Sequence, residues 1–194
     1  MKMNLANKIT ILRIVMVFVF LIICNVDELI PNARAQYIWR IVGLAFIILA
    51  ALTDILDGYV ARKYNMVTDF GKLMDPLADK IFMATAFVML VDKQCLPGWV
   101  AVVILSREFM VTGLRLLAAN KGEVISADMT GKLKTFAQMV FLGVGGSMWV
   151  GWIDPAVARK SPIWIVYYSL VAALTVYSGV VYFVKHRHLY QEDV

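Results

Sequence analysis

The sequence predicts an all-α integral membrane protein with six transmembrane helices in one bundle and both termini in the cytoplasm. Three observations support this fold class. Hydrophobic residues make up 61% of the 194 residues, charged residues make up 17%, and the mean hydropathy is +0.73; a soluble domain is far less apolar. The apolar residues gather in runs of about the ~20 residues that cross a bilayer core. Only short polar segments separate the runs, so we expect one membrane domain over residues 1–194.

Six spans follow one another along the chain. They cover residues 9–26, 37–56, 73–91, 96–119, 133–153 and 163–184. The triplet Ala33-Arg34-Ala35 after the first run resembles a signal-peptide cleavage site, but it stands well past the end of the run, so we expect the run to be a span. Two cysteines define no disulfide framework, and we expect Cys24 and Cys95 to be free, packed thiols.

The basic residues determine the predicted orientation. With a cytoplasmic amino terminus, the outer side carries only five of the 19 Lys and Arg residues: Arg34, Arg40, Lys93, Arg159 and Lys160. The positive-inside rule therefore favours this orientation. The net charge of +5 is then concentrated at the cytoplasmic face, where it suits anionic lipid headgroups and phosphorylated substrates. No soluble basic surface is left for nucleic acid.

Four aspartates interrupt the predicted cytoplasmic ends of the second and third spans. They are Asp54, Asp57, Asp75 and Asp79. Each carboxylate at membrane depth costs roughly 2.5–3.5 kcal/mol on insertion scales, so the group needs compensation. Residues three or four apart share a helix face, and the polar residues 62–70 are short enough for a tight turn. We therefore expect two pairs of carboxylates to face each other on antiparallel helices.

Converging carboxylates indicate a site for divalent cations. Hard oxygen donors without a nearby histidine or cysteine suit Mg²⁺ or Mn²⁺, and two such ions would clamp a diphosphate during a displacement reaction. Gly58 and Ala61 lack bulk and would let a nucleotide approach the backbone. Arg62 and Lys63 would add positive charge beside it.

The alternative is a purely structural role for the aspartates. Asp75 precedes Pro76 and could cap a helix, and Lys72, Lys80 and Arg62 could form ion pairs with the carboxylates. This alternative explains a single aspartate as well as the metal site does. It explains the whole set poorly, because four carboxylates with two glycines and an Ala-Arg pair are hard to obtain by chance.

A second set of charges lies in the fourth and fifth spans. Arg107 and Arg115 are eight residues apart, on roughly one helix face, and Lys132 and Lys134 open the fifth span. Four cations near a carboxylate box predict an anion site for an acceptor that carries its own phosphate. Alternatively, the lysines snorkel to the interface and Arg107 pairs with a neighbouring helix. Adjacent helical residues point apart, so Arg107 needs a partner other than Glu108.

The spacing D-x2-D-G-x2-A-R-x8-G-x3-D-x3-D, from Asp54 to Asp79, resembles the signature of the CDP-alcohol phosphatidyltransferases without a departure. The resemblance implies a six-helix, usually homodimeric membrane enzyme in which two divalent ions bind the diphosphate of a CDP-lipid and an alcohol displaces CMP. It also implies that the four aspartates are metal ligands and that Asp79 is the general base. Gly58, Ala61 and Gly71 would shape the CDP-lipid pocket.

The cationic segments and residues 7–13 resemble the branch of that family that makes phosphatidylglycerophosphate, with Ala6 departing from an expected proline. That resemblance implies transfer of a phosphatidyl group from CDP-diacylglycerol to glycerol 3-phosphate at the cytoplasmic face of the cell membrane. A sister enzyme with inositol phosphate, serine or phosphatidylglycerol as acceptor stays open. A divalent-cation transporter is less consistent, because its site would lie among broken helices at the membrane centre.

Overall fold

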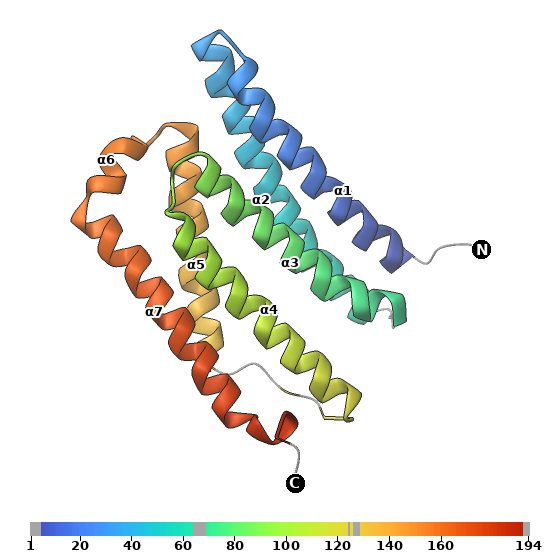
Figure 1. Cartoon of the computed structure of the whole chain (residues 1–194). Coiled ribbons are helices and arrows are strands. Elements are labelled where there is room, and N and C mark those ends of the chain that lie inside the picture. The colour runs from blue at the N-terminus through green and yellow to red at the C-terminus, as the bar shows by residue number, and fades with distance from the viewer. Residues whose placement is uncertain (1–4, 64–68, 124, 126–128, 192–194) are drawn as a thin grey trace. The chain divides into compact units, whose positions relative to one another are not determined.

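The computed structural model describes residues 5–63, 69–123, 125 and 129–191 (Figure 1). All regular secondary structure in these residues is helical, which confirms the predicted all-α class. The chain divides into two compact units: Met1–Met89 with Trp149–Trp152, and Leu90–Met148 with Ile153–Val194.

Within the described residues, six long helices coincide with the six predicted runs. They are α1 (Leu5–Val26), α2 (Ala33–Lys63), α3 (Asp69–Asp92), α4 (Gly98–Asn120), α5 (Met129–Val150) and α7 (Pro162–Lys185). Three short helices were not predicted: η1 (Asp27–Leu29), α6 (Pro155–Lys160) and η2 (Arg187–Leu189). Of the helices in the described residues, only α7 is both long and apolar enough to be a candidate membrane span. The six-span bundle and the cytoplasmic termini therefore stay predictions.

In the first unit, α1 and α2 pack against each other as a hairpin that turns through η1 (Figure 1). Asn32 caps α2, because its Oδ1 accepts hydrogen bonds from the backbone N–H groups of Arg34 (2.9 Å) and Ala35 (3.2 Å). Such a cap satisfies N–H groups that have no partner inside the helix. The cap fixes where the second arm of the hairpin begins.

A tryptophan from the end of α5 completes the packing of this hairpin. The ring of Trp149 meets Phe20 edge to face, with 6.2 Å between the ring centroids. A Cβ atom on Gly43 would lie 2.5 Å from the Trp149 ring and 2.8 Å from Ile23. Glycine is therefore the residue that lets the indole approach α2 closely.

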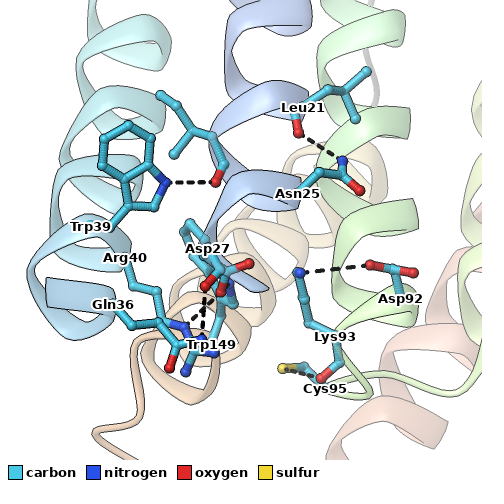
Figure 2. Close-up of polar contacts among 11 residues, drawn as sticks. Leu21, Asn25, Asp27, Gln36, Trp39, Arg40, Asp92, Lys93, Cys95 and Trp149 are labelled. Carbon is cyan, nitrogen blue, oxygen red and sulfur yellow. Dashed lines mark hydrogen bonds and ion pairs between the residues drawn. The ribbon is translucent and has the colours of Figure 1, made fainter. Parts of the chain in front are cut away.

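A buried carboxylate secures the turn of the hairpin (Figure 2). Asp27 is 0% exposed, and its Oδ2 accepts hydrogen bonds from Arg40 Nε at 2.7 Å and Trp149 Nε1 at 3.3 Å. The backbone carbonyl of Asp27 accepts from Gln36 Nε2 at 2.8 Å. The charge of Arg40, one of the five predicted outer cations, is thus balanced within the protein.

In the second unit, α4 packs along α7. One buried cluster near their carboxyl ends contains Val111, Leu114, Ala118, Tyr182 and Leu189. The segment after α7 contacts the end of α4 through two polar interactions. Lys121 Nζ donates to the Leu189 carbonyl at 2.8 Å, and His188 Nε2 lies 3.0 Å from Glu123 Oε2. These contacts hold the two helices in a fixed register.

An aromatic stack joins α5 to α7. The rings of Phe141 and Trp164 are stacked with centroids 4.8 Å apart, and Tyr167 continues the stack at 5.7 Å from Trp164. Tyr167 Oη donates to the Ala137 carbonyl at 2.9 Å, and Trp164 Nε1 donates to the Cys95 carbonyl at 3.3 Å. Stacked and hydrogen-bonded rings of this kind fix side-chain orientation as well as separation.

Both cysteines are buried, as predicted for packed thiols, and neither forms a disulfide within the described part of the chain. Cys24 is 1% exposed in the first unit and Cys95 is 0% exposed in the second. The Cys95 Sγ lies 3.4 Å from the Lys93 carbonyl. Neither thiol is accessible to solvent, so burial protects both from oxidation.

Candidate active site

The four aspartates of the predicted cluster lie on two helices. Asp54 and Asp57 belong to α2, whereas Asp75 and Asp79 belong to α3. Both helices are continuous through these positions, so the members of each pair, three or four residues apart, share a helix face. The side chains at all four positions lie outside the described residues. Their convergence across the two helices stays a prediction.

The chemistry of this donor set fits a hard divalent cation. Each pair supplies two carboxylates about one helical turn apart, and carboxylate oxygens are the ligands that Mg²⁺ and Mn²⁺ prefer. Elsewhere, among the side chains that the structure describes, no group of three or more His, Cys, Asp or Glu residues could hold a metal ion. The carboxylate chemistry of α2 and α3 makes their aspartates the candidate metal site.

The two helices extend further into the predicted turn segment, residues 62–70, than expected. α2 continues through Arg62 to Lys63, and α3 already begins at Asp69, while residues 64–68 lie outside the described part of the chain. The reason is that Ala61, Arg62 and Lys63 are good helix formers that continue the helix past its apolar run. Gly58, Ala61, Arg62 and Gly71 are all helical positions, with side-chain surroundings outside the described residues.

The early start of α3 also excludes one structural role for Asp75. This residue lies six positions after Asp69, the first residue of the helix, so it is not an N-cap as the alternative interpretation required. Pro76 likewise lies inside the helix, where its ring removes one backbone N–H donor. Capping therefore does not explain the carboxylate at position 75.

Arg107 reaches from α4 to α7. Its Nη2 donates a hydrogen bond to Ser178 Oγ at 2.8 Å, and its Nη1 lies 3.4 Å from Glu108 Oε1. The prediction that its partner comes from another helix is confirmed by Ser178. The expectation that Glu108 points away is wrong, because the long arginine side chain folds back to its neighbour. Arg107 Nε is buried and has no hydrogen-bond partner within the described part of the structure.

Arg115 also contacts α7. Its Nε donates to Tyr182 Oη at 3.0 Å, and its guanidinium carbon lies 5.6 Å from the centroid of the Tyr182 ring, within the range of a cation–π interaction. Ser178 and Tyr182 are four residues apart on α7. The two arginines therefore point to the same neighbouring helix, which confirms that they share one face of α4.

A glycine between the two hydroxyl partners brings α7 close to Arg107. A Cβ atom on Gly179 would lie 3.1 Å from the Cγ atom of Arg107, closer than ordinary van der Waals contact. The aliphatic part of the arginine thus lies against the α7 backbone, while its guanidinium reaches Ser178.

The two predicted lysines lie in the first two turns of α5, with side chains outside the described residues. Whether Lys132 and Lys134 join the arginines stays a prediction. One turn beyond Lys134, Gln138 is 1% exposed, and its Nε2 has no hydrogen-bond partner among the residues that the structure describes. A buried polar group of this kind is uncommon.

A role for Ser178, Gly179 and Tyr182 was not predicted from the sequence. A signal for the two hydroxyl groups exists, since they are four residues apart within an apolar span and so share a helix face. Serine and tyrosine are common in apolar helices, however, and nothing in the sequence pairs α4 with α7. The partners of the arginines became visible only through the packing.

Residues 3–181 of the chain match the family model for CDP-alcohol phosphatidyltransferase. A Bacillus subtilis protein named "CDP-diacylglycerol–glycerol-3-phosphate 3-phosphatidyltransferase" is 46% identical over 147 residues, covering 71% of this chain and 73% of that protein. A Rickettsia typhi protein of the same name is 37% identical over 182 residues, covering 93% and 95%. A Mycobacterium tuberculosis protein named "Probable phosphatidylglycerophosphate synthase" is 45% identical over 141 residues, covering 73% of this chain and 65% of that protein.

The chain belongs to the CDP-alcohol phosphatidyltransferase family. It is an enzyme of phospholipid synthesis, and the resemblance seen in the motif from Asp54 to Asp79 is confirmed. The motif is shared across that family, so the alcohol acceptor has to be argued from other residues.

Proposed function

We propose that this chain transfers the phosphatidyl group of CDP-diacylglycerol to glycerol 3-phosphate, giving phosphatidylglycerophosphate and CMP. The names of the Bacillus subtilis and Rickettsia typhi relatives support both substrates. Within the chain, the observation that carries the acceptor assignment is the pair Arg107 and Arg115, which are held by neutral hydroxyl groups on α7. Two cations so arranged suit an acceptor that is itself a phosphate ester.

The carboxylates of α2 and α3 form the proposed CDP-lipid end of the site. Asp54, Asp57, Asp75 and Asp79 would hold two divalent cations, Mg²⁺ or Mn²⁺. Such cations neutralise diphosphate charge and polarise the phosphorus under attack. The small residues of the same helices, Gly58, Ala61 and Gly71, leave room for the nucleotide, and Arg62 adds positive charge.

The reaction is a displacement at phosphorus. A hydroxyl oxygen of glycerol 3-phosphate forms a bond to the phosphorus that carries diacylglycerol, the bond to the CMP oxygen breaks, and CMP leaves with the electron pair. Asp79 accepts the proton of the attacking hydroxyl as general base. Arg107 and Arg115, together with Lys132 and Lys134, would bind the acceptor phosphate.

The proposed setting is the cell membrane, with six spans, both termini and the active site on the cytoplasmic side, and one domain over residues 1–194. Large apolar side chains exposed on five of the long helices support it: Phe18, Leu49, Val102, Phe136 and Leu170 are 59–68% exposed. Lipid would cover such side chains, whereas water around them is unfavourable. We further propose a homodimer, as the family resemblance implies.

One other function remains as a rival. A sister enzyme of the family would share the carboxylate motif and use inositol phosphate, serine or phosphatidylglycerol as acceptor. The arginine pair favours a phosphorylated acceptor over serine. The divalent-cation transporter considered from the sequence is excluded, because the chain belongs to a family of enzymes.

The deciding experiment measures CMP release by the purified protein with CDP-diacylglycerol, Mg²⁺ or Mn²⁺, and a panel of alcohols. We expect rapid release with glycerol 3-phosphate and little with inositol phosphate, serine, phosphatidylglycerol or glycerol. Faster release with one of those other acceptors would establish the sister enzyme. No CMP release with any acceptor would overturn the proposed reaction.

A further inference from the structure

Each arginine of the proposed acceptor site is held by one buried hydroxyl group of α7. Ser178 Oγ accepts from Arg107 Nη2 at 2.8 Å, and Tyr182 Oη accepts from Arg115 Nε at 3.0 Å. Ser178 is 1% exposed and Tyr182 is 5% exposed, so water competes little for these bonds. The contacts therefore decide which edge of each guanidinium remains available to a ligand.

The two contacts leave different donors available. Arg107 uses its terminal nitrogens for Ser178 and Glu108, and its buried Nε has no partner among the described residues. Arg115 uses its Nε for Tyr182, and no described residue accepts from its two terminal nitrogens. A phosphate has enough oxygens to accept from both edges. A bound anion would also relieve the cost of the buried, unpaired Nε.

A hydroxyl partner differs from a carboxylate partner in its effect on a bound anion. Serine and tyrosine fix the direction of a guanidinium without cancelling its charge. Arg107 also has the Glu108 carboxylate at 3.4 Å, whereas Tyr182 is the partner of Arg115 among the described residues. A carboxylate in place of Ser178 or Tyr182 would weaken the attraction for phosphate further. Gly179 contributes by its lack of a side chain, because a Cβ atom there would lie 3.1 Å from Arg107 Cγ. The three residues of α7 thus act on the same two cations.

We propose that Ser178, Gly179 and Tyr182 are positioning residues that orient Arg107 and Arg115 toward the phosphate of the acceptor, an inference that rests on the proposed function. They act through the arginines and do not contact the substrate. They therefore tune affinity for glycerol 3-phosphate and leave affinity for CDP-diacylglycerol unchanged.

The test compares two hydroxyl deletions with two matched controls on the same helix. Ser178→Ala is paired with Thr175→Val, since Thr175 Oγ1 donates to the Val171 carbonyl of its own helix, at 2.7 Å. Tyr182→Phe is paired with Tyr167→Phe, since Tyr167 Oη donates to the Ala137 carbonyl at 2.9 Å. Neither control hydroxyl has a hydrogen bond to a described arginine.

We expect Ser178→Ala and Tyr182→Phe to raise the KM for glycerol 3-phosphate about 5- to 20-fold, with the KM for CDP-diacylglycerol and both controls within about twofold of wild type. Ser178→Thr keeps a hydroxyl group and should recover most of the loss. Gly179→Ala should also raise the KM for glycerol 3-phosphate, although it removes no hydrogen-bonding group. If Ser178→Ala fails to fold, as judged by thermal unfolding, Tyr182→Phe and Gly179→Ala provide the same test.

A double-mutant cycle shows whether Ser178 acts through Arg107. In an Arg107→Ala background, Ser178→Ala should have no further effect on the KM for glycerol 3-phosphate. The same fold-change in both backgrounds would overturn the inference, as would equal increases in the two KM values or an equal effect of Thr175→Val. If Arg107→Ala and Arg115→Ala themselves leave glycerol 3-phosphate kinetics unchanged, the proposed acceptor site fails. If they raise its KM and the α7 variants do not, only the positioning role fails.

Discussion

Arginines in the two units of the molecule differ in the charge of their partners. In the first unit, Arg40 donates at 2.7 Å to Asp27, a fully buried carboxylate, so this pair is neutral. In the second unit, Arg107 and Arg115 donate to hydroxyl groups, and Glu108, at 3.4 Å from Arg107, offers one negative charge to two positive ones. Among the described side chains, the carboxylate of Asp27 matches the charge of Arg40, whereas the carboxylate of Glu108 lies beside a pair of arginines.

The difference separates an arginine that stabilises the fold from one that serves a ligand. The Asp27–Arg40 pair is completed inside the protein, with Trp149 as a further donor to the same carboxylate oxygen. A surplus cation in apolar surroundings is unfavourable unless an anion joins it. The charge of the partner is therefore a better indication of function than the presence of arginine in an apolar helix.

Matched carboxylate substitutions in the two units should give opposite results, and the largest effect is expected at the motif. Asp54→Asn, Asp57→Asn or Asp75→Asn should slow CMP release about 1,000-fold or more, because a divalent-cation site supplies several kcal/mol to such a displacement. Thermal unfolding in chelator should be unchanged or shifted upward, since the carboxylates then repel one another. Turnover near the wild-type rate in two of the three variants would contradict the metal site.

The same substitution at Asp27 should affect stability instead of turnover. Asp27→Asn leaves Arg40 without its counter-charge and should lower the free energy of unfolding by about 3 kcal/mol, the low end for a broken buried pair because Arg40 remains partly exposed. Thermal unfolding in detergent measures the loss, and CMP release per folded molecule should stay near wild type. Adding Arg40→Gln should restore part of the stability. A selective rise in the KM for glycerol 3-phosphate would instead assign Asp27 to the active site.

The helices could be predicted from sequence because apolar runs of bilayer length are strong signals. The ends of the helices were harder to predict. The second apolar run ends at Leu56, yet α2 continues to Lys63. The polar Asp57 and Arg62 end the apolar run, whereas Ala61, Arg62 and Lys63 are good helix formers and continue the helix. α6 was missed although Asp154 caps it and Pro155 starts it, because six residues carry too little periodicity.

The residues of the candidate site could likewise be predicted only in part. The carboxylate motif has a local spacing and could be found from sequence alone, and so could the two arginines, because charge inside an apolar run is conspicuous. Their partners Ser178 and Tyr182 lie about seventy residues further along the chain. They are joined to the arginines only by the packing of α4 on α7, which no local pattern encodes.

Charge removal in the second region should have a smaller and selective effect. Arg107→Gln or Arg115→Gln should weaken binding of glycerol 3-phosphate by about 1.5–3 kcal/mol for each charge-assisted hydrogen bond lost. Affinity for CDP-diacylglycerol should change little, and the variants should discriminate less between glycerol and glycerol 3-phosphate. Steady-state kinetics with both alcohols measures these effects. Equal use of the two alcohols by the wild-type enzyme would mean that these arginines do not bind an acceptor phosphate.

The smallest expected effect concerns Gln138 on α5, the buried amide whose Nε2 has no partner among the described residues. A buried donor without an acceptor is unfavourable by about 1–3 kcal/mol, so Gln138→Leu, which nearly conserves volume, should raise the free energy of unfolding by about 1 kcal/mol. Thermal unfolding of Gln138→Leu and of the cavity-forming control Gln138→Ala separates polarity from packing. A lower unfolding midpoint for Gln138→Leu would mean that the amide is paired in the folded protein. Higher stability with a raised KM for glycerol 3-phosphate would instead add a neutral donor to the acceptor site, since Gln138 lies one turn from Lys134 on the same helix.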